Sequence, residues 1–222
     1  MFKILPPEAS NLLQSLPILW SFRRCPYAMR ARLAIHASGV PVALREILLR
    51  DKPADFLATS PKGTVPVVDT GTQVIAESRD IMLWALAQND PEGWLNMPQQ
   101  GRDLIDLCDG PFKAALDHTK YAVRYPDLDP EDERQKAMDF LRDLDARLTV
   151  TPFLLGPERR MADMAILPFV RQFAQIERVW FDAQGLFGVA RWLTDFTRST
   201  RFAAVMQKHE PWQSGQDQVL FP

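Results

Sequence analysis

The chain has 222 residues, of which 46% are hydrophobic and 24% are charged, and its formal net charge at pH 7 is −2. This composition is typical of a globular protein that is long enough for one large or two small domains. Acidic and basic residues are interspersed, no apolar run reaches the roughly 18 residues of a membrane span, and the sequence does not open on a signal-peptide core, so we expect a cytoplasmic protein with neither a nucleic-acid nor a membrane partner.

The first part of the chain alternates strand and helix patterns. We set residues 1–15 apart as an N-terminal extension, because polar and apolar residues are mixed there with two prolines. A short apolar run predicts a strand over residues 16–22, and helical spacing predicts a helix over residues 26–37 that ends at Gly39. A second strand is predicted over residues 42–49, which makes the segment a parallel βαβ unit.

A β-hairpin and a closing helix are expected next. Residues 64–69 and 73–76 read as two strands that are joined by a turn containing Gly71. Pro66 interrupts the first strand, and because proline cannot donate to a sheet ladder, it must lie at a strand start or on an edge. Ser78 is expected to cap the helix that follows.

The character of the chain changes near Pro91. Residues 16–90 carry the βαβ-ββα pattern of an α/β domain with a four-stranded mixed sheet, whereas residues 91–222 predict an all-α domain. The clearest helix begins at Asp129, where an N-cap acid, a proline and further acids precede an apolar face. Further helices are predicted over residues 161–175, 189–199 and 201–208.

Cys25 is the strongest candidate for a reactive group. Pro26 follows it at the predicted helix start, where the missing N–H of a proline leaves no partner unsatisfied. Helix N-termini and nearby cations, here Arg23 and Arg24, lower a cysteine pKa from about 8.5 to roughly 3.5–7.5. Ala28 stands where a Cys-x-x-Cys motif has its second cysteine, so Cys25 is predicted to act as a monothiol through a mixed disulfide.

Other interpretations of these residue types are weaker. Cys25 can also be a buried structural thiol, although the arginines before it and the proline after it do not fit that setting. Cys108 lies in an apolar helical pattern and is predicted to fill the core. His36, His118 and His209 are too dispersed for a metal site, and no glycine-rich phosphate loop occurs, so we expect neither a metal nor a nucleotide.

Three ordered motifs give the sequence a resemblance to a known family. They are residues 24–33 around Cys25, residues 60–68 with an internal Val-Pro dipeptide, and the Glu-Ser pair at residues 77–78. With the helical second half, they resemble the glutathione transferase superfamily over nearly the full length, and its cysteine-type, omega-like members in particular. The resemblance implies a thioredoxin-like first domain, glutathione as co-substrate and a homodimer.

The resemblance also implies which residues bind glutathione. The Val65–Pro66 bond would be cis, which only an X-Pro bond adopts at a modest cost of about 0.5 to 1 kcal/mol, and the Val65 backbone would pair with the cysteinyl part. Glu77 would meet the ammonium of the γ-glutamyl group, and Ser78 with its helix N-terminus would meet the carboxylate. The full implied set is Pro26, Tyr27, Lys52, Thr64, Val65, Pro66, Glu77 and Ser78.

Simpler interpretations of three of these residues stay open. Lys52 matches a position that helps to bind the glycyl carboxylate in omega-like relatives, but isolated surface lysines are common. Glu77 can be only a solvated charge, and Ser78 can be only a helix cap.

Two positions depart from the family pattern. The helical domain usually contains a Ser/Thr-x-x-Asp capping box, and here Arg160 takes the Ser/Thr place before Asp163. Because an arginine side chain cannot accept a hydrogen bond, one of the two reciprocal cap bonds is lost at roughly 1 kcal/mol, while Asp163 should still stabilise the helix start. Ser60 stands where asparagine is usual.

We therefore predict a glutathione-dependent thiol transferase or reductase, in which Cys25 forms a mixed disulfide with glutathione. The acceptor would be a small-molecule or protein disulfide that the sequence does not identify. Two alternatives stay open. One is conjugation of glutathione to an electrophile, for which a Ser or Tyr hydroxyl is used and Tyr27 lies beside Cys25. The other is a non-enzymatic interaction module with the same fold.

Overall fold

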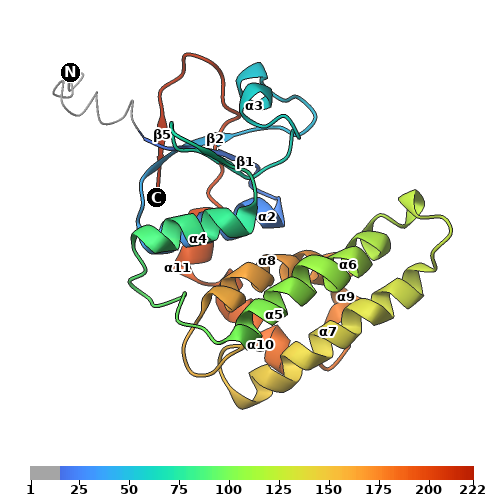
Figure 1. Ribbon diagram of the computed structural model, residues 1–222. Helices are drawn as coiled ribbons and strands as arrows, with labels where there is room; N and C mark the ends of the chain where they lie inside the picture. The colour runs from blue at the N-terminus through green and yellow to red at the C-terminus, as the bar shows by residue number, and fades with distance from the viewer. Residues whose placement is uncertain (1–15) are drawn as a thin grey trace. The chain divides into compact units, whose positions relative to one another are not determined.

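The computed structural model describes residues 16–222, and the predicted extension over residues 1–15 lies outside the described residues. The chain divides into two units (Figure 1). Of the described residues, the first unit combines those up to Pro91 with Ala203–Pro222, and the second unit is Glu92–Phe202. The sequence predicted that the helical domain extends to residue 222, but the final segment packs within the first unit instead.

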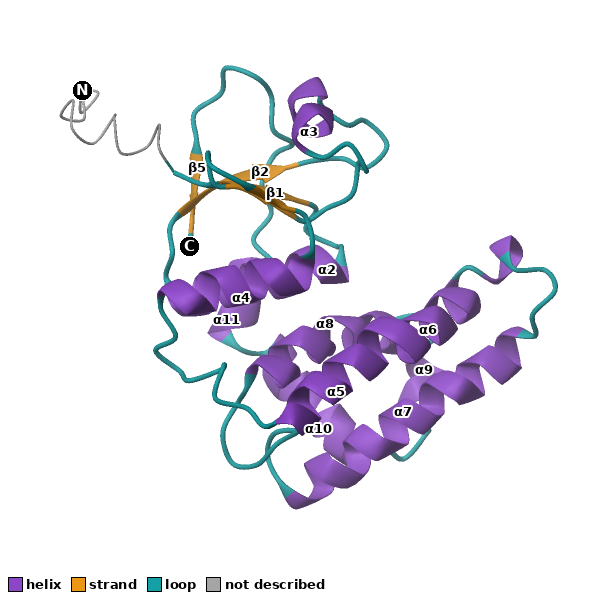
Figure 2. Ribbon diagram, in the orientation of Figure 1, coloured by secondary structure: helices purple, strands orange, loops and turns teal. Residues whose placement is uncertain are grey.

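The first unit is built on a five-stranded mixed sheet, whose strands are orange in Figure 2. The strands are β1 (Ile18–Ser21), β2 (Val42–Glu46), β3 (Val67–Asp69), β4 (Val74–Ile75) and β5 (Val219–Phe221). Their order is β4-β3-β1-β2-β5, with β1 and β2 parallel and every other pair antiparallel. The parallel pair confirms the predicted βαβ start, and the β3–β4 pair confirms the predicted hairpin.

β5 is the strand that the sequence did not predict, so the four-stranded prediction is short by one edge strand. Val42 pairs with Phe221, and Leu44 pairs with Val219. A strand of three residues is too short to show a period of its own, and its partner β2 lies near the other end of the chain. This pairing is the reason that the final residues belong to the first unit.

Three helices accompany the sheet. They are α2 (Pro26–Ser38), α3 (Ala54–Thr59) and α4 (Ser78–Gln88). Helices α2 and α4 pack against each other on one face of the sheet, and α3 lies on the other face (Figure 1). Helix α2 ends at Gly39, whose φ of 69° is in the left-handed region that glycine adopts without strain. Helix α3 was not predicted, because six residues give too little periodicity.

The second unit is helical, as predicted. Its elements are α5 (Gln99–Leu107), a π-helical segment (Cys108–Phe112), α6 (Lys113–Lys120), a 3-10 segment (Ala122–Arg124), α7 (Pro130–Val150), α8 (Met161–Ala174), α9 (Arg178–Asp182) and α10 (Phe187–Thr197). Helix α11 (Thr200–Val205) follows α10. Asp129 caps α7 by accepting the Glu131 N–H at 2.8 Å, and Cys108 is fully buried, so both predictions are confirmed. None of the described helices is both long and apolar enough to cross a membrane.

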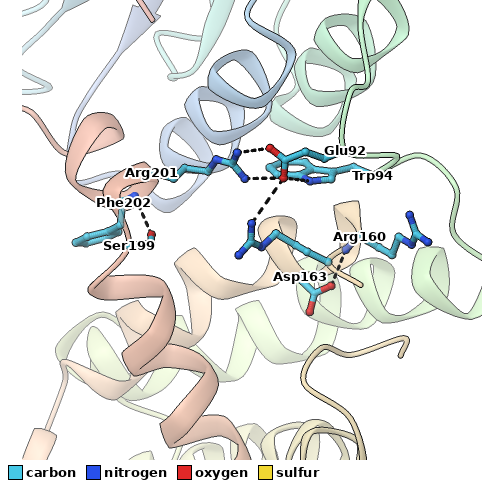
Figure 3. A network of polar contacts seen from close by, with 8 residues as sticks. Glu92, Trp94, Arg160, Asp163, Ser199, Arg201 and Phe202 are labelled. Carbon is cyan, nitrogen blue, oxygen red and sulfur yellow. Dashed lines mark hydrogen bonds and ion pairs between the residues drawn. The ribbon is translucent and has the colours of Figure 1, made fainter. Parts of the chain in front are cut away.

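Asp163 anchors the start of α8, where its carboxylate faces the backbone of Arg160 (Figure 3). Its Oδ2 accepts the Arg160 N–H at 2.9 Å, and its Oδ1 accepts the Leu154 N–H at 3.0 Å and the Trp192 indole N–H at 3.2 Å. Arg160 is the N-cap residue and cannot supply the reciprocal side-chain bond; its guanidinium donates to the Gly93 carbonyl at 2.6 Å instead. The prediction that Asp163 stabilises this helix start is confirmed.

The protonation of Asp163 makes the stability of the fold depend on pH. Burial raises the pKa of Asp163 to about 6, despite the three hydrogen bonds that lower it. Since the folded state then binds the proton more tightly than the unfolded chain does, this stabilising contribution is complete below about pH 4 and is lost as the pH rises through about 6. Relative to Asp163→Asn, the wild-type protein should lose up to about 3 kcal/mol of unfolding free energy over that range in urea titrations. A difference between the two proteins that stays constant from pH 4 to pH 7 would contradict this account.

Candidate functional site

Cys25 is the N-cap residue of α2, as the sequence predicted. Its φ of −73° and ψ of 124° are extended, and Pro26 is the first helical residue. The Cys25 carbonyl accepts the Met29 N–H at 2.9 Å, and the Cys25 N–H donates to the Phe22 carbonyl at 3.0 Å, which closes the turn between β1 and α2. The half-buried thiol therefore lies at the positive end of the helix dipole, where a thiolate is favoured.

The thiol faces the segment that leads into β3. Cys25 Sγ donates to the Val65 carbonyl oxygen across 3.7 Å. The Val65–Pro66 bond is cis, and Pro66 directly precedes β3, so it lies at a strand start as predicted. Cys25 also packs against a buried apolar cluster that includes Trp20 and Phe56. One side of the sulfur is thus apolar, and another side meets a backbone acceptor.

Lys52 and Thr64 lie on the approach to this segment. The amine of Lys52 lies beside Gly63, in the loop that ends in Val65. A Cβ atom placed on Gly63 would be 3.1 Å from Lys52 Nζ. Thr64 is exposed, and its carbonyl accepts the hydroxyl of the buried Ser60 at 3.2 Å. Ser60, which departs from the family pattern, therefore braces the same loop.

Glu77 and Ser78 lie at the start of α4. The N-cap residue is Glu77, so Ser78 is the first helical residue, and the prediction that Ser78 caps this helix is wrong by one position. The hydroxyl of the buried Ser78 accepts a hydrogen bond from Arg30 Nε at 2.9 Å, which engages the oxygen that would otherwise cap. The exposed carboxylate of Glu77 lies 3.3 Å from Lys62 Nζ.

Arg30 is a residue of this region that the sequence reasoning missed. It is only 3% exposed, and its guanidinium lies 5.2 Å from the centre of the Tyr27 ring. Because it also donates to Ser78, it connects α2 to α4. Its position inside an apolar helical run could have indicated a buried arginine with a specific partner, since charged residues are almost never buried without partners.

The structure brings together most of the predicted set. Cys25 contacts Val65 directly, and Ala76, which precedes Glu77, packs against the same apolar cluster as Cys25. Ser78 is connected to α2 through Arg30 rather than through the thiol, and Glu77 precedes it as the N-cap residue of α4. Within residues 16–222, no group of three or more His, Cys, Asp and Glu side chains is placed to hold a metal ion.

Comparison with known sequences points to one family. A family model described as the N-terminal domain of glutathione S-transferase matches residues 19–94. Glutathione S-transferase DHAR2 of Arabidopsis thaliana is 29% identical over 147 residues, which is 65% of this chain and 64% of that protein. Glutathione S-transferase omega-1 of Sus scrofa is 38% identical over 61 residues, which is 27% of this chain and 25% of that protein. This chain therefore spans less than two thirds of the length of these relatives.

Solved structures share the fold. A delta-class glutathione transferase of Nilaparvata lugens is 22% identical with a TM-score of 0.68, covering 83% of this chain and 90% of that chain. A glutathione S-transferase I bound with lactoylglutathione is 19% identical with a TM-score of 0.68, covering 86% of this chain and 98% of that chain. These similarities confirm the thioredoxin-like unit followed by a helical unit. The matched family model shows that residues 19–94 form an N-terminal domain of the glutathione S-transferase type, and the sequence relatives of the chain are glutathione transferases as well.

Proposed function

We propose that this protein is a glutathione-dependent thiol transferase or reductase whose single reacting group is Cys25. The observation that carries the proposal is the place of the thiol at the N-cap of α2, with its sulfur 3.7 Å from the Val65 carbonyl oxygen. A helix N-terminus favours the thiolate, which is the form that attacks disulfides. Glutathione is the proposed co-substrate, since the family and the names of the relatives refer to it.

The proposed reaction exchanges thiols and disulfides in two steps. The Cys25 thiolate attacks the glutathione sulfur of a glutathionylated acceptor, so that a bond forms between Cys25 and that sulfur while the acceptor leaves as a thiolate and takes up a proton. Cys25 is released when the thiolate of a second glutathione attacks the same sulfur and yields oxidised glutathione. The N-terminus of α2 favours both steps, because it stabilises the Cys25 thiolate, which attacks in the first step and leaves in the second.

The residues around Cys25 offer groups for the parts of glutathione. The Val65 backbone would pair with the cysteinyl part, and Lys52 beside Gly63 would meet the glycyl carboxylate. Since Ser78 Oγ already accepts from Arg30, the Ser78 hydroxyl proton and the first N–H groups of α4 are the donors for the γ-glutamyl carboxylate. Glu77 would meet the ammonium.

Replacing Glu77 by glutamine tests this assignment. Because a hydrogen bond to a charged group is worth about 1.5–3 kcal/mol, we expect Glu77→Gln to weaken glutathione binding about tenfold or more in calorimetric titrations. The exposed ion pair with Lys62 that is also lost contributes little to folding. Asp80→Asn is the matched control, since it removes the same charge from the first turn of α4. Equal affinities for the two variants would argue against the assignment.

The proposed function itself is tested by assaying thiol transfer and conjugation on one preparation. Thiol transfer that exceeds conjugation supports the proposal, whereas strong conjugation with negligible thiol transfer would favour the conjugating alternative. Failure of glutathione to bind at all would favour the interaction module. The homodimer stays a prediction.

A further inference from the structure

Two charged residues lie inside the first unit, near the loop between β1 and α2. Arg32 on α2 is 2% exposed, and Glu46 at the end of β2 is 9% exposed. Charged side chains are almost never buried to this degree unless specific partners hold them. Their partners therefore indicate what the two charges do.

Both residues hold the backbone of Arg23, two positions before Cys25. Arg32 Nη2 donates to the Arg23 carbonyl at 2.8 Å, and the Arg23 N–H donates to Glu46 Oε1 at 2.5 Å. Arg32 Nη1 donates in addition to the hydroxyl of Ser21 at the end of β1. The buried cation of Arg32 thus binds the carbonyl oxygen of Arg23, and the buried anion of Glu46 binds the N–H of the same residue. The segment that carries Cys25 is fixed from both sides.

Arg32 also interacts electrostatically with Cys25. Burial lowers the pKa of Arg32 to about 10, and Glu46 and the Cys25 thiolate are the negative groups that counteract this effect. Arg32 is therefore protonated at neutral pH. Burial raises the pKa of Glu46, against the N–H of Arg23 and the charge of Arg32, which favour its ionised form. In a protein interior the interaction between such charges extends over several ångströms, because little water is present to screen it.

We infer that Arg32 and Glu46 are positioning residues that set the reactivity of Cys25: Arg32 is a buried cation that favours the thiolate, and Glu46 is its countercharge. The inference rests on the proposed function of Cys25 as the reacting thiol. It assigns opposite effects to the two residues, because removing the cation disfavours the thiolate, whereas removing the anion leaves the cation uncompensated.

Other charged groups surround this pair. Arg23 and Arg24 belong to the same loop, and Arg24 is exposed, so water screens its charge. His209 approaches from the C-terminal segment, and burial followed by the charge of Arg32 lowers its pKa, which keeps it neutral at pH 7. Arg32 is thus the buried cation of this group, and Glu46 is its buried anion.

The test is the pH dependence of Cys25 alkylation by iodoacetamide, followed on the Cys25 peptide by mass spectrometry in the full-length protein. We expect Arg32→Gln to shift the alkylation midpoint upward by about one pH unit, and Glu46→Gln to shift it downward. Arg32→Lys keeps the charge and should stay near the wild-type midpoint. Arg24→Gln is the matched control, and because that arginine is solvated, its shift should be smaller than that of Arg32→Gln.

Several results would overturn the inference. One is a shift of the alkylation midpoint in the same direction for Arg32→Gln and Glu46→Gln, because a disturbed loop would affect both variants alike. The others are an unchanged midpoint in both variants and a larger shift for Arg24→Gln than for Arg32→Gln. If Arg32→Gln does not fold, the double variant with Glu46→Gln removes both buried charges, and its midpoint should lie above that of Glu46→Gln alone. Alkylation needs no glutathione, so a shifted midpoint without thiol transfer would refute the proposed function and leave this inference standing.

Discussion

Cys25→Ala is expected to lower the rate of glutathione-dependent thiol transfer at least about a thousandfold, while the affinity for glutathione changes by less than about threefold. The methyl group cannot form the mixed disulfide and loses the long Sγ–H contact to the Val65 carbonyl, whereas Glu77 and Ser78 lie at the start of α4. Steady-state rates with a glutathionylated substrate and calorimetry with glutathione measure the two quantities.

Cys108→Ala is the matched control for this experiment. Cys108 is the other thiol of the chain, and it is fully buried in the π-helical segment of the second unit. Its replacement removes one sulfur from the core and should cost about 1 kcal/mol of stability without a comparable loss of activity. Undiminished thiol transfer in Cys25→Ala, or equal losses in both variants, would reject the monothiol mechanism.

Asp163→Ala is expected to lower the free energy of unfolding by about 3–5 kcal/mol. The substitution leaves the N–H groups of Arg160, Leu154 and Trp192 without their acceptor, and the residues Leu154 and Trp192 are only 3% and 2% exposed. Each buried donor without a partner costs about 1–3 kcal/mol, which exceeds what is recovered by removing a costly buried charge. The melting temperature should fall by roughly 10 °C in a calorimetric scan.

Asp195→Ala provides the comparison for this prediction, since Asp195 is an exposed aspartate on α10 of the same unit. Surface substitutions of this kind usually stay within about 0.5 kcal/mol. Asp163→Asn should lie between the two variants, because its amide oxygen retains one of the two acceptor atoms. A loss below about 1 kcal/mol for Asp163→Ala would show that the three hydrogen bonds do not hold the start of α8.

The features that could be predicted from the sequence are those that neighbouring residues determine. Cys25 and Pro26 specify a helix start by themselves, as Asp129 and Pro130 do for α7, and Gly39 specifies the end of α2. Local stereochemistry and capping decide these points, and no distant contact is needed. The βαβ-ββα order also follows from local patterns read one after another.

The features that could not be predicted depend on residues that are distant in sequence. β5 forms because it pairs with the edge strand β2, and a pattern of three residues is too short to predict this pairing. Arg32 and Glu46 read as ordinary charges on a helix and a strand, and only the folded chain shows that both bind the backbone of Arg23. Arg30 was missed for the same reason, since its partner Ser78 lies on another helix.

The most direct test of the central claim is mass spectrometry of the wild-type protein after incubation with oxidised glutathione. Our account predicts one glutathione adduct per chain, on the peptide that contains Cys25, with Cys108 unmodified and with complete reversal by reduced glutathione. A protein that takes up no adduct, or that carries it on Cys108 alone, would contradict the proposal that Cys25 is the reacting thiol.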